Sequence, residues 1–144
     1  MSKKKILIIN GPNINLLGYR EKSIYGINTL KEHNIVLKKY AEKKNGLITF
    51  FQSNYEGKII DTIQNARNKK DAIIINGAAY THTSIAILDS LRAFEGLIYE
   101  VHISNIYSRE SYRRKSYISE VSNGVICGLG FLGYELALDA ILLN

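Results

Sequence analysis

The stretch KILIIN at residues 5–10 decides the fold of this chain. Its four consecutive branched aliphatic residues are typical of a strand that is buried on both faces, as in the parallel sheets of α/β proteins. Four later segments have a similar apolar character, and we expect them to be strands too: 47–52, 72–76, 97–104, and 124–130 with its turn.

Segments with helical periodicity separate these strands. The first, at 29–44, opens with a Thr29-x-x-Glu32 pattern, which predicts a capping box. Because strands alternate with helices, we expect a single α/β domain over residues 1–144, with a parallel sheet covered on both faces. The most natural arrangement is a flavodoxin-like, doubly wound sheet in the strand order 2-1-3-4-5. The other helices are expected at 56–69, 83–94 and 131–143.

Length and composition exclude several classes of protein. Of the 144 residues, 46% are hydrophobic and 22% are charged, an ordinary globular balance. The apolar runs are far shorter than a membrane span and no leader-like segment opens the chain, so we expect a soluble, cytoplasmic protein with no membrane partner. The single cysteine, Cys127, excludes an internal disulfide and a thiolate metal cluster, and we expect it in the core.

The formal net charge of +6 raises the alternative of a nucleic-acid-binding protein. Much of this charge, however, lies in lysine pairs on the outer faces or ends of the expected helices, where solvated lysine is usual. The arginines are distributed differently, in a way that suits a small anionic ligand better than a nucleic acid: Arg109, Arg113 and Arg114 share one loop and Arg20 lies in another.

The expected strand order also predicts where a ligand should bind. In doubly wound sheets the site lies beyond the carboxyl ends of the strands, near the point where the strand order reverses. The segments that follow strands one, three and four should therefore meet, and they are the most polar in the chain: 10–26, 76–84 and 102–117.

The segment GLGFLG at 128–133 matches the G-x-G-x-x-G pattern of dinucleotide-binding folds. That fingerprint also needs a following strand and an acidic residue about 20 positions later. This chain ends eleven residues after Gly133, so we expect the glycines to form a tight turn that lets the last helix pack closely.

Two pairs of side chains point to acid–base chemistry. Glu100 and His102 lie two apart in a strand and share a face, so the carboxylate can orient the imidazole and prepare it as a general acid. A tyrosine with its ordinary pKa of about 10 acts as a base only as a phenolate, which a nearby guanidinium favours. Arg20 and Arg109 are available to Tyr25. The alternatives to these catalytic roles are that His102 is a core histidine satisfied by one partner and that Tyr25 is an ordinary packed loop tyrosine.

Several other polar residues could serve either a functional site or an ordinary structural role. His82 and Thr83 precede a helix, where backbone N–H groups suit an anion or a hydroxyl-rich ligand, although a helix cap and a surface histidine are equally compatible. Asn76 can donate and accept hydrogen bonds in the same pocket. Asp89 is either a solvated helix residue or a subunit contact, and we expect His33 at the surface or at an edge.

The motifs INGPNINLLGYRE…IYG, QSNYEG, NGAAYTHTS, EVHISN, SRESYRRKSY and GLGFLGYELAL together closely resemble the type II 3-dehydroquinate dehydratases, almost from end to end. The resemblance implies a flavodoxin-like fold and a homododecamer built as a tetramer of trimers. It also implies elimination of water from 3-dehydroquinate to 3-dehydroshikimate through an enolate, with no metal or organic cofactor. Both aromatic biosynthesis and quinate breakdown use this reaction.

The resemblance implies a role for each matched residue. Tyr25 matches the base that removes a proton from C2, and His102, oriented by Glu100, matches the acid that protonates the departing C1 hydroxyl. Arg20 and Arg109 match the guanidinium groups near the tyrosine. Asn13 matches the residue that holds a water against the enolate oxygen, and the remaining matches bind substrate: Asn76, His82, Asp89, Ile103 through its backbone N–H, Ser104 and Arg113.

Three departures from the family pattern concern loops. Lys22 and Gly77 stand where the family usually has prolines, and Tyr55 replaces a frequent histidine. We expect them to bear on loop dynamics and substrate affinity and not on the reaction, because none is a matched catalytic residue. The type I enzymes use a Schiff-base lysine, but no lysine here ends an expected strand. The alternatives are a non-catalytic flavodoxin-like module that binds a small anion, and an inactive family member.

Overall fold

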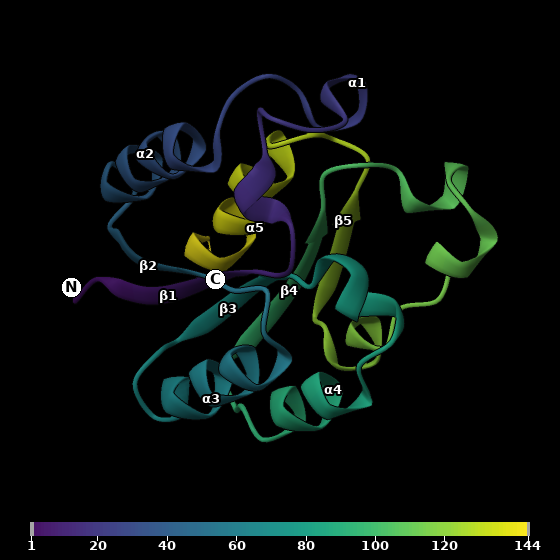
Figure 1. The fold of residues 1–144 in the computed structure, drawn as a ribbon. Coiled ribbons are helices and arrows are strands. Elements are labelled where there is room, and N and C mark those ends of the chain that lie inside the picture. Colours follow the sequence, from purple (N-terminus) through teal and green to yellow (C-terminus); the bar gives the residue numbers. More distant parts are fainter. Residues whose placement is uncertain (1, 144) are drawn as a thin grey trace.

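The computed structural model describes residues 2–143, and its five strands form one parallel sheet in the order β2-β1-β3-β4-β5 (Figure 1). This confirms the doubly wound, flavodoxin-like order predicted from the sequence. No helix in this part of the chain is long and apolar enough to cross a membrane. The strands are β1 (Lys4–Asn10), β2 (Gly46–Gln52), β3 (Ala72–Asn76), β4 (Leu97–His102) and β5 (Gly124–Cys127).

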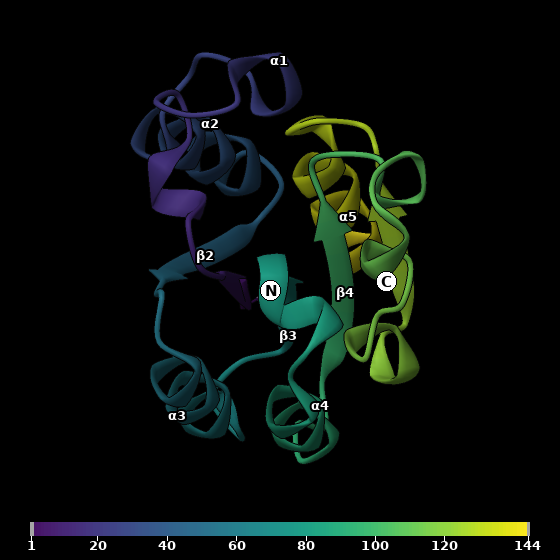
Figure 2. The same cartoon turned by 45° about the vertical axis from the view of Figure 1, so that its right-hand side comes forward.

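Four long helices cover the sheet, α2 and α5 on one face and α3 and α4 on the other (Figures 1 and 2). Alternate residues of β1 serve the two layers. Ile6 and Ile8 pack with α2 and α5, while Leu7 and Ile9 pack with α3 and α4. The aliphatic run at 5–10 is therefore buried on both faces, as predicted. The helices are α2 (Leu30–Glu42), α3 (Glu56–Ala66), α4 (Ile85–Arg92) and α5 (Leu132–Leu142).

The helix boundaries follow from local chemistry. The predicted capping box opens α2: Thr29 Oγ1 accepts from the Glu32 backbone N–H at 3.2 Å, and the Glu32 carboxylate accepts from the Thr29 N–H. The helix predicted at 56–69 ends at Ala66, because the backbone of Arg67 leaves the helical conformation (φ −58°, ψ 132°). Sequence analysis missed α1 (Lys22–Tyr25), a four-residue helix, and five short 3₁₀ turns in the loops.

Three other expectations can be compared with the structure. The fourth strand ends at His102 and not at residue 104, so Ser104 belongs to the loop. Cys127 is half-buried and not in the core, because β5 is an edge strand that leaves its residues partly open. The turn at 128–133 is confirmed: Gly128 and Gly130 have positive φ angles of 85° and 61°, and a Cβ on Gly133 would lie 3.2 Å from Val101 Cγ1.

Candidate active site

A cavity of about 320 Å³ lies beyond the carboxyl ends of β1, β3 and β4. Its lining residues come from the segments that follow these three strands, which the strand order predicted to meet. The cavity brings together most of the residues singled out from the sequence: Asn13, Arg20, Tyr25, Asn76, His82, His102, Ile103, Ser104, Arg109 and Arg113.

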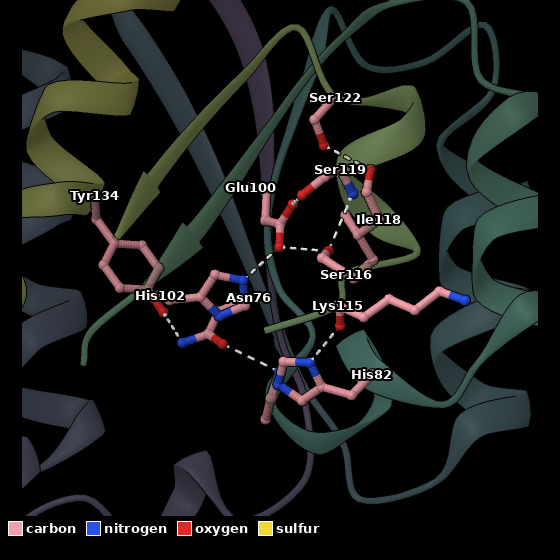
Figure 3. A network of polar contacts seen from close by, with 11 residues as sticks. Asn76, His82, Glu100, His102, Lys115, Ser116, Ile118, Ser119, Ser122 and Tyr134 are labelled. Carbon is pink, nitrogen blue, oxygen red and sulfur yellow. Dashed lines mark hydrogen bonds and ion pairs between the residues drawn. The ribbon is translucent and has the colours of Figure 1, made fainter. Parts of the chain in front are cut away.

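One wall of the cavity carries His102, the last residue of β4, which is 4% exposed. Its Nε2 bonds to the carboxylate of Glu100, which is 0% exposed and shares the same face of the strand. Ser116 Oγ donates to Glu100 Oε2 at 2.7 Å, and Ser119 Oγ donates to Oε1 (Figure 3). Burial alone would raise the pKa of Glu100, but the bonds from His102, Ser119 and Ser116 outweigh it and hold this pKa below its usual value.

His82 ends the 3₁₀ turn η2 (Ala78–His82), and its ring lies 6.3 Å from that of His102, centroid to centroid. Its Nδ1 lies 2.7 Å from the carbonyl oxygen of Lys115 (Figure 3). A carbonyl can only accept, so Nδ1 carries the proton. Burial lowers the pKa of His82, helped by the charges of His102 and Arg113 and opposed by the Lys115 bond. His82 therefore stays neutral near pH 7.

Asn76, the last residue of β3, is held by two bonds. Its Nδ2 donates to the Tyr134 hydroxyl at 3.0 Å and its Oδ1 accepts from the Ala78 N–H at 3.1 Å. The Tyr134 hydroxyl in turn donates to Asn10 Oδ1 at 2.5 Å. Tyr134 is fully buried in α5, and burial raises its pKa far above the usual range, so it remains a neutral donor. This network fixes the Asn76 amide at the cavity wall.

Tyr25, at the end of α1, also lines the cavity. Arg109 Nη1 donates to the Tyr25 hydroxyl at 2.8 Å and also to Ser104 Oγ at 3.3 Å. The guanidinium carbon of Arg20 lies 5.1 Å from the centre of the Tyr25 ring, and its Nη1 pairs with the Glu21 carboxylate at 2.6 Å. Two positive charges therefore lie close to this phenol, and one of them bonds its oxygen directly.

Of the other matched residues, Asn13 and Arg113 line the cavity, whereas Asp89 does not. Asn13 has a left-handed backbone (φ 69°), and its N–H donates to Asn54 Oδ1 at 3.0 Å. Arg113 Nε is paired with the Glu110 carboxylate at 2.6 Å. Asp89, by contrast, lies on α4 outside this cavity, where its 65% exposed side chain is 3.8 Å from Arg92.

His33 lies away from the cavity and is half-buried at the edge of the molecule. Its ring stacks on Phe131 with 3.6 Å between centroids. The expectation of a surface or edge position holds, but the sequence did not predict the stacking partner.

Sequence analysis missed several residues that support the site. Ser116 and Ser119 look like ordinary loop serines, and their one signal was a spacing of three, which suits a short turn beside a buried carboxylate. Asn10 was missed although, like the predicted Asn76, it ends an apolar strand; the two are partners in the β1–β3 register. Within residues 2–143, no group of three or more His, Cys, Asp or Glu side chains could hold a metal ion.

Comparisons with known proteins agree with one another. A family model described as Dehydroquinase class II matches residues 4–142. The chain is 54% identical over 139 residues to the 3-dehydroquinate dehydratase of Clostridium botulinum (strain Hall), covering 96% of this chain and 95% of that protein. The crystal structure of a type II dehydroquinase from Butyrivibrio crossotus DSM 2876 matches with a TM-score of 0.94 and 46% identity, over 96% of this chain and 97% of the other. The enzyme from Propionibacterium acnes matches with a TM-score of 0.96 and 38% identity, over 99% of both chains.

Proposed function

This chain belongs to the type II dehydroquinase family and is a 3-dehydroquinate dehydratase, a hydro-lyase, and we propose that it eliminates water through an enolate intermediate. The product is 3-dehydroshikimate, and the proposed steps use side chains of this protein and no metal or organic cofactor. One observation carries the proposal: a tyrosine bonded to an arginine and a histidine bonded to a carboxylate line the same cavity.

Tyr25 is the base in this proposal. Its phenolate takes the proton from C2 of the substrate, and the electron pair of the broken C–H bond moves onto the neighbouring ketone as an enolate. The Arg109 bond and the Arg20 charge support this role because both favour a negative phenol oxygen. Asn13 holds a water against the enolate oxygen, where a positioned donor stabilises the developing charge.

His102 is the acid. When the enolate collapses, the C1–O bond breaks, His102 gives a proton to the departing hydroxyl, and water leaves as the C1=C2 double bond forms. Glu100 orients the imidazole and stabilises its charged form, which the bond between them supports. The two residues act at different carbons, so their removal should stop the reaction at different steps.

The remaining lining residues bind the substrate. The Ile103 N–H and Ser104 hold its carboxylate, while Asn76, His82 and Arg113 contact its hydroxyl groups. A neutral His82 with its proton on Nδ1 suits this role, because Nε2 can then accept a hydrogen bond from a hydroxyl.

We also propose a homododecamer, a tetramer of trimers, in which Asp89 reaches the site of a neighbouring subunit. The exposed position of Asp89 outside the cavity of its own chain supports this placement. Light scattering should give about twelve times the 16.3 kDa mass of one chain. Asp89→Ala should then raise KM without removing turnover. A monomeric, fully active protein would contradict both statements.

The reaction is tested by mixing the purified protein with 3-dehydroquinate and following ultraviolet absorbance. Dehydration creates a conjugated enone that the substrate lacks, so the absorbance should rise, and the rise should survive treatment with EDTA. A flat trace from folded protein that still binds the substrate would point instead to a non-catalytic binding module.

A further inference from the structure

The segment 115–119, here called the strap, contacts His82 directly and is linked to His102 through Glu100 (Figure 3). The Lys115 carbonyl accepts from His82 Nδ1, and the hydroxyls of Ser116 and Ser119 bond the Glu100 carboxylate that holds His102. Tyr117 N–H donates to the Thr81 carbonyl at 3.0 Å, which fastens the strap to η2. One short segment therefore governs the surroundings of both imidazoles.

The direction of the hydrogen bonds in the strap is fixed. Ser116 Oγ accepts from the Ser119 backbone N–H at 3.1 Å, so its single proton is free to point to Glu100 Oε2. Ser119 Oγ donates to the other oxygen, Oε1. With His102 Nε2 as a third donor, Glu100 accepts three bonds at a site that is closed to solvent. A protonated carboxyl could accept only two of them, because its own O–H would have to act as the donor along the third.

A buried glutamate and histidine that share one proton can place it on either partner. We propose that Ser116 and Ser119 are positioning residues that keep this proton on His102 by holding Glu100 as an acceptor. His102 Nε2 is then engaged by the carboxylate, which leaves Nδ1 to carry the transferable proton. This inference rests on the proposed role of His102 as the acid, and it identifies what makes the imidazole the acidic member of the pair.

The charges around the pair are consistent with this assignment. His82 on η2 interacts with both members of the pair, Arg113 on the 3₁₀ turn η4 (Ser111–Arg113) interacts with His82, and Tyr25 and Arg109 line the same cavity. The lowered pKa of Glu100, despite its burial, agrees with an ionised carboxylate.

Ser119→Ala is the cleanest test, because this hydroxyl donates to Glu100. We expect kcat to fall by about tenfold, the factor for removing one hydrogen bond to a charged group. KM should change by less than about twofold, because Ser119 does not line the cavity. Ser119→Thr keeps the hydroxyl and should restore kcat. Ser122→Ala is the matched control, since Ser122 Oγ donates to the Ile118 carbonyl at 2.8 Å and leaves Glu100 untouched.

Infrared difference spectra without substrate separate positioning from general damage. When the Glu100–His102 pair of the wild type takes up a proton, no infrared band of a protonated carboxyl should appear, because His102 takes this proton. In Ser119→Ala such a band should grow, and it should be absent from Ser119→Ala combined with Glu100→Gln.

Each outcome decides between the two proposals. If Ser119→Ala keeps wild-type kcat and shows no new carboxyl band, or if Ser122→Ala gives the same losses, the positioning role is wrong. If His102→Ala retains full turnover, the proposed acid fails instead, whatever the infrared spectra show.

Discussion

The acid half of the cavity stands on β4, where Glu100 and His102 are 0% and 4% exposed, whereas the Arg20 and Glu21 side chains of the base half are 36% and 45% exposed. A buried charged pair needs every partner in place, because an unpaired charge cannot be solvated. The base half rests on a four-residue helix in a loop, and none of the residues of this helix is buried. Stability and turnover should therefore be separable in the base half and linked in the acid half.

Tyr25→Phe should have the largest effect on turnover and almost none on stability. It removes the hydroxyl but keeps the ring and its packing, so kcat should fall by about 10³-fold, within the usual range for one general base. Steady-state rates and thermal unfolding measure the two effects. Tyr19→Phe is the control, since Tyr19 lies on the same loop and is 71% exposed. A variant with kcat within tenfold of the wild type would remove Tyr25 from this role.

Tyr134→Phe should lower stability as well as turnover, because its hydroxyl is fully buried and holds Asn76 at the cavity wall. Its loss leaves Asn10 Oδ1 without a donor and Asn76 Nδ2 without an acceptor. We expect the free energy of unfolding to fall by about 1–3 kcal/mol and kcat by about tenfold. Tyr40→Phe is the control, because its hydroxyl bonds Asp139 away from the cavity. If turnover stays at the wild-type level, Asn76 does not depend on this network.

The acid half should also make the free energy of unfolding depend on pH in the acidic range. The folded pKa of Glu100 lies below its usual 4.5, so ionised Glu100 contributes stability above the unfolded pKa. This contribution is lost as the pH falls through the folded pKa. Ser119→Ala removes one of the bonds that lower the pKa, so its unfolding free energy should decline less from neutral pH into acid. Denaturant unfolding at several pH values measures this slope, and parallel curves would count against it.

Glu21→Gln in the base half should have the smallest effect on both stability and KM. The Arg20–Glu21 pair is exposed on both sides, so the free energy of unfolding should change by less than about 0.5 kcal/mol. KM should fall by at most about threefold, since Arg20 then loses a competitor for the anionic substrate. Glu95→Gln, a change at an exposed position away from the cavity, is the control. A stability loss comparable to that of Tyr134→Phe would erase the contrast between the halves.

The same contrast explains what the sequence could predict. The aliphatic runs at 5–10 and 72–76 predict strands because burial on both faces demands them, and the strand order then places the cavity. The Glu100–His102 pair was predictable because the period of a strand places both on one face.

The sequence did not predict contacts between segments that are far apart in the chain. Helical periodicity places Tyr134 on the packed face of α5, but it does not show that its hydroxyl meets Asn10, 124 residues away. The four residues of α1 are too few for a helical pattern, since such a short helix depends on tertiary packing. Ser119 looked like any loop serine because its partner, Glu100, comes from another element.

Deuterium exchange at C2 of 3-dehydroquinate tests the division of labour between the halves most directly. In heavy water, His102→Ala should put deuterium on C2 of the recovered substrate while forming little product, because Tyr25 still makes the enolate. Tyr25→Phe should put none there. Deuterium in substrate recovered from Tyr25→Phe, or none from a His102→Ala protein that binds the substrate, would contradict the assignment of base and acid.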